Sequence, residues 1–221
     1  EEELGITFTV SSEDGCLKIA ASGENGHAST PWKGKNALTG LLALIERLPL
    51  AECGQLKAVR ALNHLMPHGD WFGAGLGIQM SDEESGELTL AFSMLDISEK
   101  SLEGEFDSRC PICATKENTI DVIRKNMEAE GISFNTEELE PPHHVPADSD
   151  FVKTLLSAYE SYSGRKGECI AIGGGTYVHH LKNGVAFGAC LPETENHMHG
   201  PDEFAVVDEL LMSAKIFAQV I

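Results

Sequence analysis

Ile172-Gly173-Gly174-Gly175-Thr176-Tyr177 opens the most informative part of the chain, which continues to Glu203. Three consecutive glycines carry no Cβ, so a ligand or another chain segment can approach the backbone closely. The short apolar run at 185–189 predicts a buried strand. A polar loop with His197 and His199 follows, ahead of a helix expected over 205–220. A histidine beside carboxylates in such a loop is a candidate metal ligand, and an ordinary surface loop is the alternative.

Composition excludes several classes of protein. The 221 residues are 42% hydrophobic and 23% charged, which suits one large domain or two small ones. The net charge of −19 would repel a phosphate backbone, so nucleic acid is not an expected partner. No apolar run is long enough for a membrane span, and Glu1-Glu2-Glu3 does not resemble a signal peptide. A cytoplasmic protein with six reduced cysteines is expected.

The elements expected along the chain are mostly set by local signals. The expected strands are a hairpin from 6–10 and 16–21 with a turn at 11–15, then strands at 88–95, 105–109, 169–172 and 185–189. A polar loop is expected at 22–31. The expected helices run from Asn36 to Pro49, over 55–65, over 117–130 with Thr115 as the cap, and over 149–162. Gly131 is expected in the left-handed conformation after its helix.

A proline-rich connection separates two regions. Three prolines between Glu140 and Pro146 favour an extended link over a domain interior. Residues 1–140 are therefore expected to form one domain, and residues 141–221 part of another. The second region has too few strands and helices to cover both faces of a sheet. The fold class expected is α/β: an α+β domain with ferredoxin-like βαβ elements, followed by an incomplete α/β domain.

Several other motifs favour an ordinary structural interpretation. Cys110-Pro111-Ile112-Cys113 has redox spacing, but the expected helix begins after its second cysteine. His68-Gly69-Asp70 supplies only two metal-binding side chains. Gly73-Ala74-Gly75-Leu76-Gly77 does not have dinucleotide-binding spacing. The adjacent pairs His143-His144 and His179-His180 diverge on extended backbone, so neither pair is suited to chelate one ion.

Five motifs then follow one another along nearly the whole chain. They are Gly26-His27-Ala28-Ser29-Thr30-Pro31 with Gly34-Lys35-Asn36-Ala37, Asp107-Ser108-Arg109-Cys110-Pro111, Gly173-Gly174-Gly175-Thr176-Tyr177, Asn183-Gly184-Val185-Ala186-Phe187-Gly188, and His199-Gly200-Pro201-Asp202-Glu203. In this order they resemble the dinuclear-zinc peptidases, the family of aminoacylase, carboxypeptidase G and the bacterial dipeptidases. The glycine triplet with Thr176 and Tyr177, and the stretch from His68 to Thr89, are most similar to the Xaa-His (carnosine-type) dipeptidase branch.

The resemblance implies a role for each matching residue. His27 would lie on a lid domain and stabilise the scissile carbonyl oxygen as it gains negative charge. Arg109 would pair with the free carboxylate of the dipeptide substrate. The substrate-binding loop would consist of Gly173, Gly174, Gly175 and Thr176. The last zinc ligand would be His199. Asp202 and Glu203 would hold that ligand in place. The implied reaction is hydrolysis by a zinc-bound water whose pKa is lowered to about 7.

The family's other metal ligands precede the lid, and here no histidine precedes His27. One histidine cannot hold two zinc ions, because a zinc site takes about three protein ligands. Residues 1–140 are therefore expected to be a lid or dimerisation domain missing its start, and residues 141–221 the C-terminal portion of a catalytic domain. Without the missing part of the enzyme, these 221 residues are expected to bind no catalytic zinc and to be inactive. The expected partners are a dipeptide, the missing N-terminal half of the same enzyme and, through exposed apolar surface, a second copy.

Three alternatives stay open. The chain would otherwise be a non-catalytic peptide-binding or interaction protein derived from the family, or a redox protein that uses Cys110 and Cys113. Within the family, a deacylase or an aminopeptidase is a further alternative, because substrate choice depends on pocket shape. Manganese is an alternative to zinc as the working metal.

Overall fold

The computed structural model describes residues 2–188, 190–198 and 200–221. These residues form two compact units. The first contains Glu1–Pro142 and Ala171–Gly174, and the second contains His143–Ile170 and Gly175–Ile221. The sequence places the division at a similar point but does not anticipate that Ala171–Gly174 belongs with the first unit. The lid and catalytic roles expected of the two regions stay predictions.

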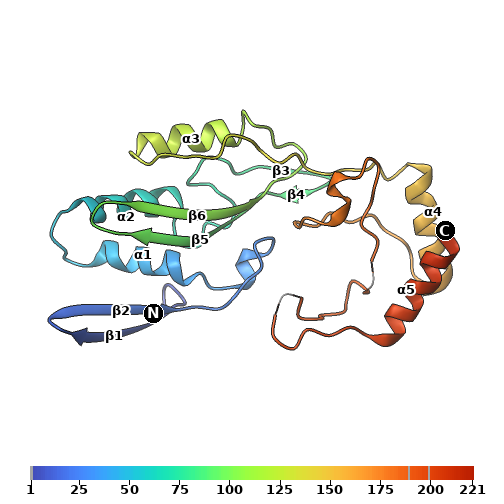
Figure 1. Ribbon diagram of the computed structural model, residues 1–221, viewed down its shortest axis with the longest axis horizontal. Helices are drawn as coiled ribbons and strands as arrows, with labels where there is room; N and C mark the ends of the chain where they lie inside the picture. The colour runs from blue at the N-terminus through green and yellow to red at the C-terminus, as the bar shows by residue number, and fades with distance from the viewer. Residues whose placement is uncertain (1, 189, 199) are drawn as a thin grey trace. The chain divides into compact units, whose positions relative to one another are not determined.

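The first unit begins with a hairpin of β1 (Thr7–Glu13) and β2 (Cys16–Ser22), shown in blue in Figure 1. Its turn is only Asp14 and Gly15, whose φ values of 52° and 78° fit the tight turns that match strand twist. The expected turn at 11–15 was therefore too long. Just ahead of β1, Ile6 is 1% exposed, and a Cβ on Gly40 would lie 2.6 Å from its Cγ1. Gly40 is thus the residue that lets Ile6 pack on its helix.

That helix, α1 (Ala37–Arg47), is followed by α2 (Gly54–Leu65). Asn36 caps α1 as predicted, because its side chain accepts a hydrogen bond from the Thr39 N–H. The same side chain donates to the Phe92 carbonyl, which ties the start of the helix to a strand. α1 packs against α2, β2 and β5, so it joins the hairpin to the rest of the unit.

The strand that α1 contacts, β5 (Thr89–Ile97), pairs antiparallel with β6 (Leu102–Arg109). A register shift between Phe92 and Met94 reverses the alternation of side chains, as a β-bulge does. Before the bulge Leu90 and Phe92 face the core, and after it Leu95 and Ile97 do. The core is completed by residues from α1, α2, α3 and the loops between them, including Leu42, Val59, Leu62, Leu65, Leu76, Ile78, Ile123 and Met127.

The short strands β3 (Ser81–Asp82) and β4 (Gly86–Glu87) are joined by a turn organised around Asp82. Its carboxylate accepts hydrogen bonds from the Ser85 N–H and hydroxyl, the Glu84 N–H, and the Cys113 N–H. These donors, Ser85 foremost, hold the pKa of Asp82 at about 2. Ser85 also accepts from the Ile112 N–H, so this turn anchors the Cys110–Cys113 segment.

The lowered pKa of Asp82 predicts a loss of stability in acid. A carboxyl whose folded pKa lies below its unfolded value of about 3.9 stabilises the fold above that pH, and the contribution is lost as pH falls towards about 2. We expect the urea midpoint of the wild type to fall between about pH 4 and pH 2. Asp82→Asn should be less stable at neutral pH and should converge with the wild type near pH 2. Glu83→Gln is the control, and parallel curves for D82N and wild type would contradict the prediction.

The helix α3 (Ile120–Ala129) begins later than expected. Thr115 does not cap it. Instead the Thr115 hydroxyl accepts from the Asn118 N–H, and the Asn118 side chain accepts from the Thr115 N–H, which makes a separate turn ahead of the helix. Thr119 is the residue before the helix. Gly131 has φ 76°, as predicted for the residue that ends a helix in the left-handed conformation.

The second unit contains α4 (Asp150–Ser163), η2 (Tyr177–His180) and α5 (Val207–Val220). The helix expected at 149–162 is α4, which Ser149 caps. α4 and α5 pack against each other (Figure 1). The predicted strand at 169–172 does not form, nor does the one at 185–189 over its described residues, 185–188. The physical reason is that a strand needs a partner, and no strand pairs with either segment in the described part of the chain. Ile170 and Ile172 are accordingly exposed.

The fold class is α/β as expected, with helices and three small antiparallel sheets in the described residues. None of the described helices is both long enough and apolar enough to cross a membrane. The face of the β5–β6 ribbon that points away from its core carries Thr89, Asp107 and Arg109, and this face positions the candidate site.

Candidate active site

The loop that carries His27 is closed at its base by backbone contacts. Glu24 and Lys35 exchange two backbone hydrogen bonds, of 3.1 and 2.8 Å, and their side chains form an ion pair. Glycines occur where the beginning and the end of this loop come together. A Cβ on Gly23 would lie 2.0 Å from the Lys35 carbonyl oxygen, and one on Gly34 would lie 2.8 Å from the Gly26 nitrogen. The glycines therefore permit a backbone approach that no other residue allows.

His27 is exposed, and its ring orientation is set by the residue two positions later. The Ser29 N–H lies 3.2 Å from Nδ1 and the Ser29 hydroxyl lies 2.8 Å from it. An Nδ1 that accepts from a backbone N–H uses its lone pair, so the proton of the neutral ring is assigned to Nε2. His27 can thus act as a hydrogen-bond donor through Nε2.

Thr89 fixes this loop to the first residue of β5. Its hydroxyl donates to the Ala28 carbonyl at 2.8 Å, and Thr89 is only 5% exposed because the loop covers it. In the antiparallel register Thr89 lies directly opposite Arg109, the last residue of β6. Directly opposite residues have Cβ atoms about 5 Å apart. The His27 loop and Arg109 therefore meet at the same end of the ribbon.

Arg109 is held by Asp107, which is two residues earlier on the same face of β6. Nη2 of Arg109 donates to Oδ2 of Asp107 at 2.8 Å. Nε lies 2.7 Å from Oδ1, but the N–H is poorly aligned for a hydrogen bond, so this second contact is an ion pair. The Arg109 side chain is 34% exposed and that of Asp107 is 39% exposed. The pair is accessible at the surface of the first unit.

The start of the glycine loop packs against both of these features. A Cβ on Gly173 would lie 2.6 Å from Cβ of Ser29 and 3.6 Å from Cβ of Arg109. One on Gly174 would meet nothing within 4 Å. Gly173 is thus needed for close packing between the His27 loop and the end of β6, whereas Gly174 leaves space above its backbone.

The other predicted site residues are not among the described residues of the first unit. Gly175 and Thr176 belong to the second unit, where the Thr176 N–H donates to Nδ1 of His179. His199, the predicted zinc ligand, lies outside the described residues. The structure therefore brings His27, Arg109, Gly173 and Gly174 together in one unit, whereas Gly175 and Thr176 are assigned to the other unit.

The described residues do not provide a zinc site. Within them there is no group of three or more His, Cys, Asp or Glu side chains suited to a metal ion, whereas zinc takes about three or four protein ligands. The histidine pairs bind other partners: His143 Nε2 contacts the Gly184 carbonyl at 2.5 Å, and its ring packs on that of His179.

The motifs given an ordinary structural interpretation have structural roles. His68 bonds to the Thr39 hydroxyl and the Leu4 carbonyl, which secures the chain ahead of β1 to α1. The Asp70 carboxylate accepts from the N–H groups of Phe72, Ala74 and Gly75, which fixes the glycine-containing loop. Burial raises the pKa of the Cys110 thiol, the opposite of what a reactive thiolate needs.

Comparison with known proteins identifies the family of this chain. Residues 7–221 match the peptidase family M20/M25/M40. The chain belongs to this family. The resemblance to the dinuclear-zinc peptidases is thereby confirmed. The match includes the His27 loop, the ribbon with Arg109 and the glycine loop.

Two bacterial relatives of this M20 chain are named dipeptidases. A putative dipeptidase, YtjP, of Bacillus subtilis (strain 168) is 36% identical over 210 residues, which are 95% of this chain and 44% of the relative. The Beta-Ala-Xaa dipeptidase of Lactobacillus delbrueckii subsp. lactis is 32% identical over 223 residues, 100% of this chain and 46% of the relative. The M20 chain thus spans less than half the length of these relatives.

A solved structure, an M20 family metallo-carboxypeptidase from Sulfolobus solfataricus, matches with a TM-score of 0.45 and 16% identity. The match covers 81% of this chain and 43% of that one.

Sequence reasoning missed three residues that position the M20 motifs. Ser29 sets the ring of His27, Thr89 anchors its loop, and Asp107 holds Arg109. Only Asp107 had a usable signal, since residues two apart on a strand share a face. Thr89 is distant in sequence from Ala28, so no local pattern connects them.

Proposed function

We propose that this chain is the lid and C-terminal part of a metal-dependent dipeptidase, and that alone it is inactive. The observation that carries the proposal is the convergence of the His27 loop, Arg109 and Gly173 at one end of the β5–β6 ribbon. Membership of a peptidase family and the names of the relatives support it.

The chemistry of these residues suits recognition of a short peptide. His27 donates from Nε2 to the scissile carbonyl oxygen as negative charge develops, an interaction worth about 3 kcal/mol of barrier. Arg109 presents a planar fork to the free carboxylate of the substrate. A requirement for that carboxylate together with a short substrate would make the enzyme a dipeptidase. The open space above Gly174 lets a substrate backbone approach.

The metal is zinc, with manganese as the other candidate, and its remaining ligands lie outside the residues described. The partners are a dipeptide and the N-terminal half of the same enzyme, and the compartment is the cytoplasm. Homodimer formation is a further part of the proposal, since Val10 and Leu17 of the β1–β2 hairpin are 58% and 66% exposed.

The test uses the intact gene product that contains this chain. We expect it to hydrolyse β-alanyl-histidine, to lose activity with a chelator, and to recover it with zinc or manganese. The 221-residue chain alone should be inactive. Preference for N-acetyl amino acids would indicate a deacylase, and cleavage of longer peptides an aminopeptidase. Peptide binding without cleavage by the intact protein would contradict the proposal and favour a non-catalytic function.

A further inference from the structure

We propose that Asp107 is a positioning residue that aims Arg109 at the substrate carboxylate. The proposal rests on the function given above, because it assumes that Arg109 binds this carboxylate. Three observations carry it: the two contacts between the side chains, the burial of the Arg109 Nε atom, and the position of the pair beside the His27 loop.

The contacts with Asp107 use only one edge of the guanidinium. Oδ1 lies 2.7 Å from Nε, and Oδ2 accepts from Nη2. Nε is inaccessible to solvent. A guanidinium has five N–H donors, so the end formed by Nη1 and the outer hydrogen of Nη2 still has the geometry to bind a second carboxylate through two bonds. Asp107 therefore orients Arg109 without occupying its binding end.

Holding Arg109 in place favours binding, because a free arginine side chain loses much rotamer entropy when it binds a ligand. The chain is also strongly acidic, with 35 acidic residues against 16 basic ones, so an unrestrained arginine has competing carboxylates to contact. The contact with Asp107 also partly neutralises the charge of Arg109. We therefore expect Asp107 to improve the orientation of Arg109 and not its long-range attraction for the substrate carboxylate.

The neighbours of the pair restrict where its free end can point. Thr89 lies opposite Arg109 and carries the His27 loop, while a Cβ added to Gly173 would lie 3.6 Å from Arg109 Cβ. Ala91 lies opposite Asp107 and leaves its side of the ribbon uncrowded. Arg109 thus lies beside both the loop that carries the proposed oxyanion donor and the start of the glycine loop.

The decisive experiment compares a dipeptide with its C-terminal amide, which lacks the free carboxylate, in the intact enzyme. We expect the wild type to prefer the free acid and Arg109→Ala to lose that preference. Asp107→Asn should raise KM for the free acid about tenfold, with kcat nearly unchanged, and should leave kcat/KM for the amide unchanged. Asp107→Glu, which retains the charge, should restore part of the preference.

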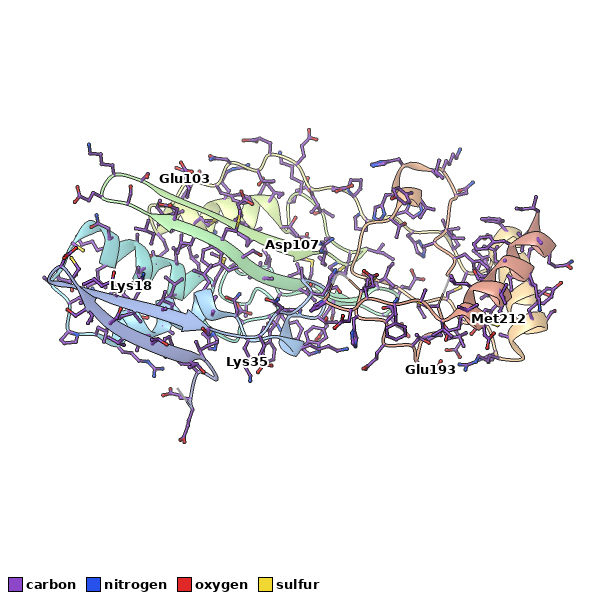
Figure 2. The ribbon with its side chains drawn as sticks, turned by 60° about the horizontal axis from the view of Figure 1, so that its bottom comes forward. Lys18, Lys35, Glu103, Asp107, Glu193 and Met212 are labelled. Atoms are coloured by element: carbon purple, nitrogen blue, oxygen red, sulfur yellow. The ribbon has the colours of Figure 1, made fainter. Side chains whose placement is uncertain are left out.

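Glu103→Gln is the matched control, because it removes one carboxylate from the same face of the same strand, towards the other end of the ribbon (Figure 2). It should behave as the wild type. If Arg109→Ala abolishes the preference but Asp107→Asn does not, the proposal for Asp107 is overturned while the function survives. Equal losses for acid and amide in D107N would mean a merely structural role and would also overturn it. If the wild type cleaves no dipeptide, or Arg109→Ala keeps the preference, the proposed function fails and this proposal fails with it.

A second measurement does not depend on activity. In the 221-residue chain the Arg109 Nε–H should be protected from exchange with water, and its nitrogen-15 NMR signal should be visible near neutral pH. D107N should accelerate that exchange, and E103Q should not. Unchanged exchange in a folded D107N chain would overturn the proposal.

Discussion

Replacing His27 by alanine in the intact enzyme is expected to lower kcat for a dipeptide about 100- to 1,000-fold, with a much smaller change in KM. The reason is that a donor aimed at the developing oxyanion acts mainly in the transition state. Ser29 already orients the ring, because its N–H lies 3.2 Å from Nδ1 and directs the proton to Nε2. Steady-state kinetics with β-alanyl-histidine would measure both constants.

Two further variants sharpen the His27 prediction. His64→Ala removes a histidine that is 75% exposed and bonded to Glu130, so it is the control for loss of an imidazole at the surface. Ser29→Ala keeps the backbone N–H and removes only the hydroxyl at 2.8 Å, so its kcat should lie between those of the wild type and H27A. An H27A enzyme with normal kcat and raised KM would instead make His27 a ground-state binding residue.

The elements that the sequence predicts well are those whose causes are local. Asn36 and Ser149 cap their helices through hydrogen bonds to residues three positions later. The hairpin turn at Asp14 and Gly15 lies within the expected range but is shorter than expected, and Gly131 ends α3 with a positive φ as predicted. In each case the residue and its hydrogen-bonding target are close in sequence, so pattern alone is sufficient.

The two kinds of error have different causes. Residues 169–172 and 185–189 have strand composition, but a strand is stabilised by cross-strand pairing, which composition cannot supply. The hydroxyl of Thr115 accepts from the N–H of Asn118 three positions later, as a cap does, but this bond closes a separate turn and the α-helix starts after Thr119. The local signal therefore predicts the hydrogen bond but not where the helix begins.

In the candidate site too, some residues are predictable from the sequence and others are not. The motifs predict His27, Arg109 and the glycine loop through their resemblance to a family. They do not show that Gly173 packs on Ser29, or that Thr89 anchors Ala28 across 61 positions of sequence. Such contacts depend on the register of β5 against β6, which itself contains a bulge. The support of a site is therefore harder to predict than its reacting groups.

Gly23→Ala is expected to disrupt the His27 loop and to reduce activity almost as much as loss of His27 itself. The new Cβ would lie 2.0 Å from the Lys35 carbonyl oxygen and 3.1 Å from the Ala37 nitrogen. Both are backbone atoms, so no side-chain rotation relieves the clash. The beginning and the end of the His27 loop must therefore separate, which breaks the two backbone hydrogen bonds between Glu24 and Lys35. Overpacking of this kind costs about 1–3 kcal/mol of unfolding free energy.

The matched control for Gly23 is Gly54→Ala, since a Cβ at Gly54 would meet nothing within 4 Å. Gly54 is the first residue of α2, so alanine there should be neutral or stabilising by up to about 1 kcal/mol. Urea unfolding of both variants measures this difference, and amide exchange at Glu24 and Lys35 reports the opened loop directly. If G23A retains protected amides at these two residues and full activity, the closure of the loop does not position His27. Arg109 lies on a strand that the clash does not reach, so KM for the dipeptide should be nearly unchanged in G23A. If amide exchange rises and kcat falls while KM stays nearly unchanged, Gly23 supports catalysis through the placement of His27.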